Sequence, residues 1–74
     1  MFSKKFKKIG LKIAYYRKRK ALKQMEVAEK AGISCSYLSK IETGKVRYSL
    51  AVLIQIVKVL EIDPGELLTD GSSY

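Results

Sequence analysis

The segment from Gln24 to Thr43 constrains the fold most, because small, aliphatic and glycine residues recur in it at set intervals. Ala28 leaves room for a close helix contact, and Gly32 can adopt the left-handed conformation that ends a helix. The aliphatic residues that would then share one core are Val27, Ile33, Leu38 and Ile41. This spacing predicts two short helices that cross steeply around a tight turn.

Apolar periodicity elsewhere predicts three more helices and no strands, so we expect an all-α, compact five-helix bundle. The five helices should cover about residues 5–20, 24–31, 35–42, 50–60 and 64–68. Ser34 and Ser49 are predicted N-caps, and Pro64 suits a first helical turn. The folded domain should span residues 1–68 and leave a flexible polar tail at 69–74.

The fourth predicted helix is apolar on more than one side. Its expected core face consists of Leu50, Leu53, Ile54, Val57 and Leu60. A second stripe, formed by Val52, Ile56 and Val59, is rotated away from that face. This stripe is either covered within the small domain or forms a homodimer contact, and the sequence leaves both interpretations open.

Charge is distributed very unevenly along the chain. The net charge is +8, yet residues 1–25 hold ten basic side chains and no acidic one, whereas the remainder has a net charge of −2. Such asymmetry favours a polyanionic partner. No apolar run approaches the roughly 20 residues that span a bilayer, and no signal peptide is evident, so we expect a cytoplasmic protein without a membrane partner.

Residue types also exclude several kinds of chemistry. The chain has no histidine and one cysteine, Cys35, so an internal disulfide and a conventional zinc site are excluded. Because no cluster of acid, base and nucleophile is evident, we expect no enzyme, no metal and no cofactor.

The pattern extends well beyond the central segment. The residues that carry it are Ile9-Gly10, Ile13, Arg17, Gln24, Val27-Ala28, Ala31 to Ser34, Ser36 to Glu42, Gly44-Lys45, Ser49-Leu50 and Ile62 to Pro64. Together they resemble the Cro-like phage-repressor (Xre) family of helix-turn-helix DNA-binding domains over about residues 9–68. The resemblance implies the lambda-repressor-like fold, with a recognition helix that enters a DNA major groove.

The resemblance assigns roles to individual residues. It implies base reading by Cys35, Ser36, Ser39 and Lys40, of which Lys40 can donate to guanine. The implied phosphate-binding residues are Lys23, Gln24, Ser34, Tyr37, Thr43, Gly44, Lys45 and Arg47. For Tyr37, we favour packing of the ring with its hydroxyl on a phosphate over direct contact with a base.

Arg17 and Glu42 match a pair that forms a partly buried salt bridge in related repressors. Three departures from the family stand out in this chain. Ala21 replaces a usual glycine, Lys23 replaces a Ser or Thr N-cap, and Tyr48 replaces a common proline.

The expected function is that of a sequence-specific transcriptional regulator of double-stranded DNA, a repressor acting as a homodimer on a palindromic operator. The alternative is an Xre-like interaction or antitoxin module, whose main partner is a protein such as a toxin.

Overall fold

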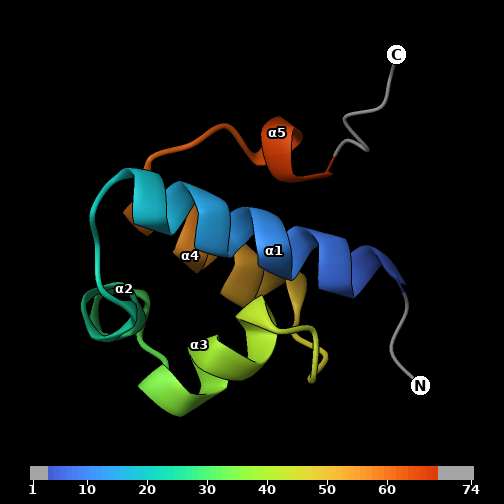
Figure 1. Ribbon diagram of the computed structural model, residues 1–74, viewed down its shortest axis with the longest axis horizontal. Coiled ribbons are helices and arrows are strands. Elements are labelled where there is room, and N and C mark those ends of the chain that lie inside the picture. The colour runs from blue at the N-terminus through green and yellow to red at the C-terminus, as the bar shows by residue number, and fades with distance from the viewer. Residues whose placement is uncertain (1–3, 69–74) are drawn as a thin grey trace.

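Five α-helices follow one another through residues 4–68, the part of the chain that the computed structural model describes (Figure 1). They are α1 (Lys4–Arg19), α2 (Gln24–Ala31), α3 (Cys35–Glu42), α4 (Leu50–Leu60) and α5 (Pro64–Leu68). The predicted all-α, five-helix fold is confirmed, and residues 4–68 contain no strand. The tail predicted at 69–74 lies outside the described residues.

Short-range signals set the ends of the two central helices. The Ser34 hydroxyl caps α3 by accepting a hydrogen bond from the Tyr37 amide at 3.0 Å. Gly32 ends α2 in the left-handed conformation, with φ of 78°. The Ile33 amide then donates to the Ala28 carbonyl at 2.9 Å, which closes the turn between α2 and α3.

Two other helices end on residues that carry a Cβ atom. Ala21, which follows α1, has φ of 57°, and Glu61, which follows α4, has φ of 56°. The left-handed region is unfavourable for such residues. Ala21, which stands in place of the usual glycine, therefore holds a strained left-handed conformation.

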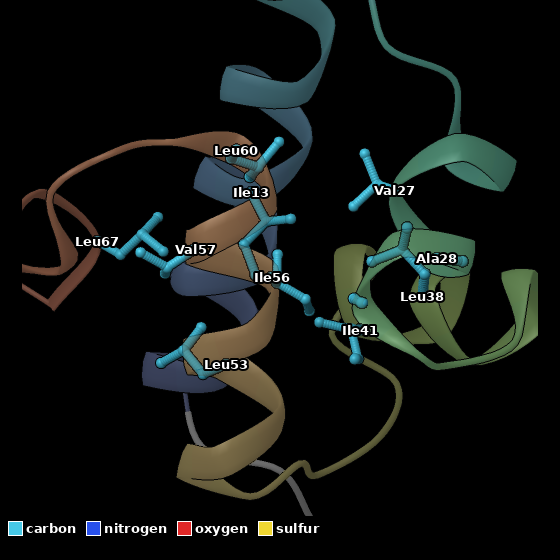
Figure 2. Packing of buried hydrophobic residues seen from close by; sticks show 11 residues of the cluster. Ile13, Val27, Ala28, Leu38, Ile41, Leu53, Ile56, Val57, Leu60 and Leu67 are labelled. Atoms are coloured by element: carbon cyan, nitrogen blue, oxygen red, sulfur yellow. The ribbon is translucent and has the colours of Figure 1, made fainter.

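The core lies where the first four helices converge, and α5 covers one side of it (Figure 2). Its buried apolar residues are Ile13, Val27, Ala28, Ala31, Leu38, Ile41, Leu53, Ile56, Val57, Leu60 and Leu67. Contacts of α1 with α3 and of α2 with both α3 and α4 hold the two central helices in place. The core therefore fixes the orientation of α3, the predicted recognition helix.

The predicted faces of α4 were partly wrong. Leu50 and Ile54, expected in the core, are 65% and 41% exposed, whereas Ile56 is fully buried. Of the two interpretations left open for the second stripe, coverage within the domain holds for Ile56, which packs in the core and is unavailable for a dimer contact. Val52 and Val59 are partly buried against the same core. Because α4 is apolar on nearly every side, its periodicity did not identify which side faces inward.

No helix among residues 4–68 has the length and apolar character needed to cross a membrane.

Candidate nucleic-acid interface

Helix α3 has one buried side and one solvent-exposed side. Its aliphatic residues Leu38 and Ile41 are fully buried. Cys35, Ser36 and Lys40 are exposed, and Ser39 is partly buried. Residues separated by one helical turn share a face, so these four predicted base-reading residues lie together on the open side. The structure thus presents a continuous polar surface on α3.

A buried ion pair joins α1 to the last residue of α3. The Arg17 Nε atom lies 2.7 Å from the Glu42 Oε2 atom, and Arg17 Nη2 donates to Glu42 Oε1 at 3.1 Å. The remaining Arg17 nitrogen donates to the Leu22 carbonyl at 2.9 Å. The side chains of Arg17 and Glu42 are only 10% and 4% exposed. This geometry is bidentate, which fixes the direction of both side chains.

Gln24 extends this network to the first turn of α3. Its Nε2 atom donates to Glu42 Oε1 at 2.9 Å, and its Oε1 atom accepts a long contact of 4.0 Å from the Cys35 thiol. One Nε2 hydrogen of Gln24 is left for another acceptor. The Gln24 side chain is therefore held at the boundary between α2 and the polar face of α3.

The start of α2 offers backbone donors. A lysine side chain has no acceptor atom, so Lys23 cannot cap the helix as Ser or Thr would. Instead the Glu26 carboxylate accepts a hydrogen bond from the Lys23 amide at 2.8 Å. The first-turn amides of Gln24 and Met25 have no acceptor within an α-helix. They form the positive end of the helix, where anions bind.

The loop after α3 is closed by its own hydrogen bonds. The Thr43 hydroxyl donates to the Ser39 carbonyl at 2.9 Å, and the Lys45 amide donates to the Lys40 carbonyl at 2.9 Å. Gly44 has φ of 73°. The hydroxyl proton of Thr43 is thus already used within the protein. Lys45 is exposed and supplies a positive charge in this loop.

The hydroxyl of Tyr37 has a different partner from the phosphate that we favoured. Its ring is partly buried, as expected, but its hydroxyl donates to the Arg47 carbonyl at 3.2 Å. A phosphate also accepts hydrogen bonds, and the single phenol proton cannot serve both acceptors at once. In this structure Tyr37 therefore holds the loop that carries the exposed Arg47 side chain.

Tyr48, at the position where the family often has proline, packs against α1. Its ring meets Phe6 edge-to-face, with 4.9 Å between the ring centroids. Its hydroxyl is buried and has no hydrogen-bond partner among the described residues. Burial, with a smaller effect of neighbouring Tyr37, raises the pKa of Tyr48 to about 12.

The geometry of α2 and α3 agrees with the comparison to known protein families. The helix-turn-helix family HTH_3 matches residues 13–67 of this chain. This chain belongs to the Cro-like helix-turn-helix family. The predicted resemblance is therefore confirmed over nearly the whole segment that carried it.

Several family members are similar to the chain over most of its length. The HTH-type transcriptional regulator SinR of Bacillus licheniformis is 40% identical over 63 residues, which cover 84% of this chain and 57% of SinR. The ImmF control region 10 kDa protein of Bacillus phage phi105 is 42% identical over 57 residues, covering 77% of this chain and 63% of that protein. The chain thus spans little more than half the length of these relatives.

Two solved structures have the same helical arrangement. The restriction-modification controller protein C.AhdI of Aeromonas hydrophila superposes with a TM-score of 0.83 at 29% identity, covering 88% of this chain and 98% of that one. The N-terminal DNA-binding domain of SinR from Bacillus subtilis gives a TM-score of 0.77 at 38% identity, covering 88% and 96%. The lambda-repressor-like fold of this family is therefore the fold of the chain.

Proposed function

We propose that this chain is a transcriptional regulator that binds duplex DNA by placing α3 in the major groove. The observation that carries the proposal is the open polar face of α3, which Cys35, Ser36 and Lys40 expose while Leu38 and Ile41 anchor the opposite side. A helix fits the major groove and can reach base edges there. Relatives described as transcriptional regulators support this role.

Within this proposal, α3 reads the bases. Lys40 donates to the O6 and N7 atoms of guanine. The hydroxyls of Ser36 and Ser39 can donate to acceptors or accept from donors on the base edges. Cys35 is small enough to allow apolar contact with a thymine methyl group. Lys40 is thus the residue expected to discriminate most strongly between base pairs.

Phosphate contacts on both sides of α3 position it. On one side are the first amides of α2, with Gln24 and Lys23; on the other are the exposed side chains of Lys45 and Arg47. The amides of Thr43 and Gly44 already donate within the loop, so Gly44 contributes its small size, and Thr43 binds a phosphate only where its hydroxyl leaves the Ser39 carbonyl. Ser34, whose oxygen accepts from the Tyr37 amide, still has a hydroxyl proton to donate. Tyr37 joins this set only where its hydroxyl leaves the Arg47 carbonyl.

The regulator is proposed to act as a repressor in the form of a homodimer on a palindromic operator. One module of this size reads few base pairs, and two-fold symmetry doubles the contacts at half-sites about 10 base pairs apart. On α4, Val52 and Val59 remain only partly covered, and Leu50 and Ile54 are exposed. Because Leu50 and Ile54 lie on the opposite flank of the buried face from Val52 and Val59, one of these two pairs can supply an apolar contact between two copies.

Selection of bound duplexes from a random pool, followed by affinity measurement, tests the proposal. We expect recovery of a common motif with two-fold symmetry, bound at least about a thousandfold more tightly than random duplex. Lys40→Ala should relax preference at one base pair in each half-site. Equal and weak affinity for every duplex would contradict the proposal and favour a module whose partner is a protein, such as a toxin.

A further inference from the structure

Lys7 of α1 packs directly on the loop that follows α3. The Cα, Cβ and Cγ atoms of Lys7 lie 2.9–3.0 Å from the point that a Cβ atom on Gly44 would occupy. Gly44 also has a positive φ, so both the local backbone and this contact require glycine there. The base of the Lys7 side chain is therefore fixed against the loop, while the residue as a whole is exposed. Such an arrangement leaves the ammonium group in solvent.

The close approach of α1 to the loop after α3 depends on Gly10, one turn after Lys7 in α1. A Cβ atom on Gly10 would overlap the Ile41 carbonyl oxygen and lie 3.2 Å from that of Glu42. Glycine at position 10 thus lets α1 cross the carboxyl end of α3 in contact. The first turn of α1 is thereby carried to the loop at 43–45.

The exposed charged side chains where α1 crosses the end of α3 are positive. Residues 4–25 contain no acidic side chain, and α1 has none in its first turn. The one acidic residue of α3, Glu42, is buried and paired with Arg17. Carbonyl groups at the end of α3 would repel a phosphate. Lys7 places a cation beside that end, together with the positive amino-terminal end of α1.

We propose that Lys7 is a phosphate-binding residue, which extends the DNA backbone contact from the Gly44 loop onto the first turn of α1. This inference rests on the proposed function, because it assumes that the loop faces a DNA strand. The ammonium group stands three bonds beyond the Cγ atom that lies against the loop, so this flexible end can extend to a phosphate bound at the loop or to the adjacent one on the same strand. Such a contact is independent of base sequence.

Titration of duplex binding against salt tests the role of Lys7. The probe is a 20 base-pair duplex of random sequence, and the variants are Lys7→Gln, Lys7→Arg and, as a matched control on α4, Lys58→Gln. Glutamine retains the Cβ and Cγ atoms that contact Gly44, so the fold should persist, which thermal unfolding verifies. Lys58 is also exposed, and its loss changes the net charge by the same amount.

We expect Lys7→Gln to reduce the slope of log affinity against log salt by about 0.9 and to weaken binding about fivefold to tenfold near 0.1 M salt. Lys7→Arg should keep the slope of the unmodified protein. Identical slopes for Lys7→Gln and Lys58→Gln would overturn the role of Lys7, provided that Lys45→Gln still reduces the slope. Absence of salt-dependent binding by the unmodified protein would instead overturn the proposed function itself, and the role of Lys7 with it.

Discussion

The guanidinium of Arg17 and the carboxylate of Glu42 form a buried bidentate pair, with 2.7 Å between Arg17 Nε and Glu42 Oε2. Because Glu42 is the last residue of α3, the pair sets how the carboxyl end of that helix lies against α1. Gln24 donates to the same carboxylate, so the start of α2 is held by the same group. Three helices thus meet at one carboxylate.

Removal of one partner from this pair should be strongly destabilising. Arg17→Ala leaves the Glu42 carboxylate buried without its cation, and we expect a loss of about 3–5 kcal/mol in the free energy of unfolding. Urea denaturation at neutral pH measures this loss. The double variant Arg17→Met, Glu42→Met should be more stable than Arg17→Ala, since it buries no charge. A change below about 1 kcal/mol for Arg17→Ala would mean that the pair contributes no more than a surface ion pair.

A methyl group at position 10 should force α1 away from α3. In Gly10→Ala the new Cβ atom would overlap the Ile41 carbonyl oxygen, and a backbone group cannot move aside as a side chain can. We expect thermal unfolding to show a loss of about 1–3 kcal/mol. Gly65→Ala is the matched control, because its nearest contact would be an ordinary 3.5 Å. Equal stability of these two variants would show that the helices do not approach as closely as described.

The left-handed residue after α1 offers a route to greater stability. Ala21 has φ of 57°, a conformation that costs an alanine about 1 kcal/mol and glycine almost nothing. Ala21→Gly should therefore raise the free energy of unfolding by a few tenths to about 1 kcal/mol. Ala14→Gly, inside α1, should lower it by about 1 kcal/mol. Destabilisation by both changes, seen in parallel denaturation curves, would exclude a left-handed Ala21.

The buried hydroxyl of Tyr48 should contribute nothing to stability at neutral pH. It has no hydrogen-bond partner among residues 4–68, so Tyr48→Phe should leave stability unchanged or raise it by about 1 kcal/mol. Burial raises the pKa of Tyr48 to about 12, above its usual value of 10.0. The unfolded chain therefore loses this proton first as pH rises.

Stability should accordingly be unaffected by Tyr48 below pH 10 and should decrease between pH 10 and 12. Tyr48→Phe should show a smaller decrease over the same interval, as measured by denaturant unfolding at each pH. Parallel pH profiles for the two proteins would contradict the burial of this hydroxyl.

The sequence predicted those elements for which local signals agree. Ser34 caps α3 and Gly32 ends α2 because side-chain acceptors and left-handed glycine act within a few residues of the helix end. Arg17 and Glu42 could be paired only through the family resemblance, since 25 positions separate them along the chain.

Features that depend on several helices were not predictable in this way. Ile56 is buried and Ile54 exposed, although both are aliphatic, because contacts with α2 rather than periodicity orient α4. The bond from Tyr37 to the Arg47 carbonyl depends on the loop path. In the sequence Lys7 is one of ten basic residues among positions 1–25, and its place one turn before Gly10 is the signal that sets it apart.

An NMR titration of the protein with the selected duplex, which follows the backbone amide of each residue, tests directly whether α3 reads DNA. We expect the largest shifts at Ser36, Ser39 and Lys40, flanked by shifts at Gln24 and Lys45, with α4 nearly unchanged apart from any dimer contact. Shifts concentrated on α4 and α5, with α3 unaffected, would contradict the claim that α3 reads DNA.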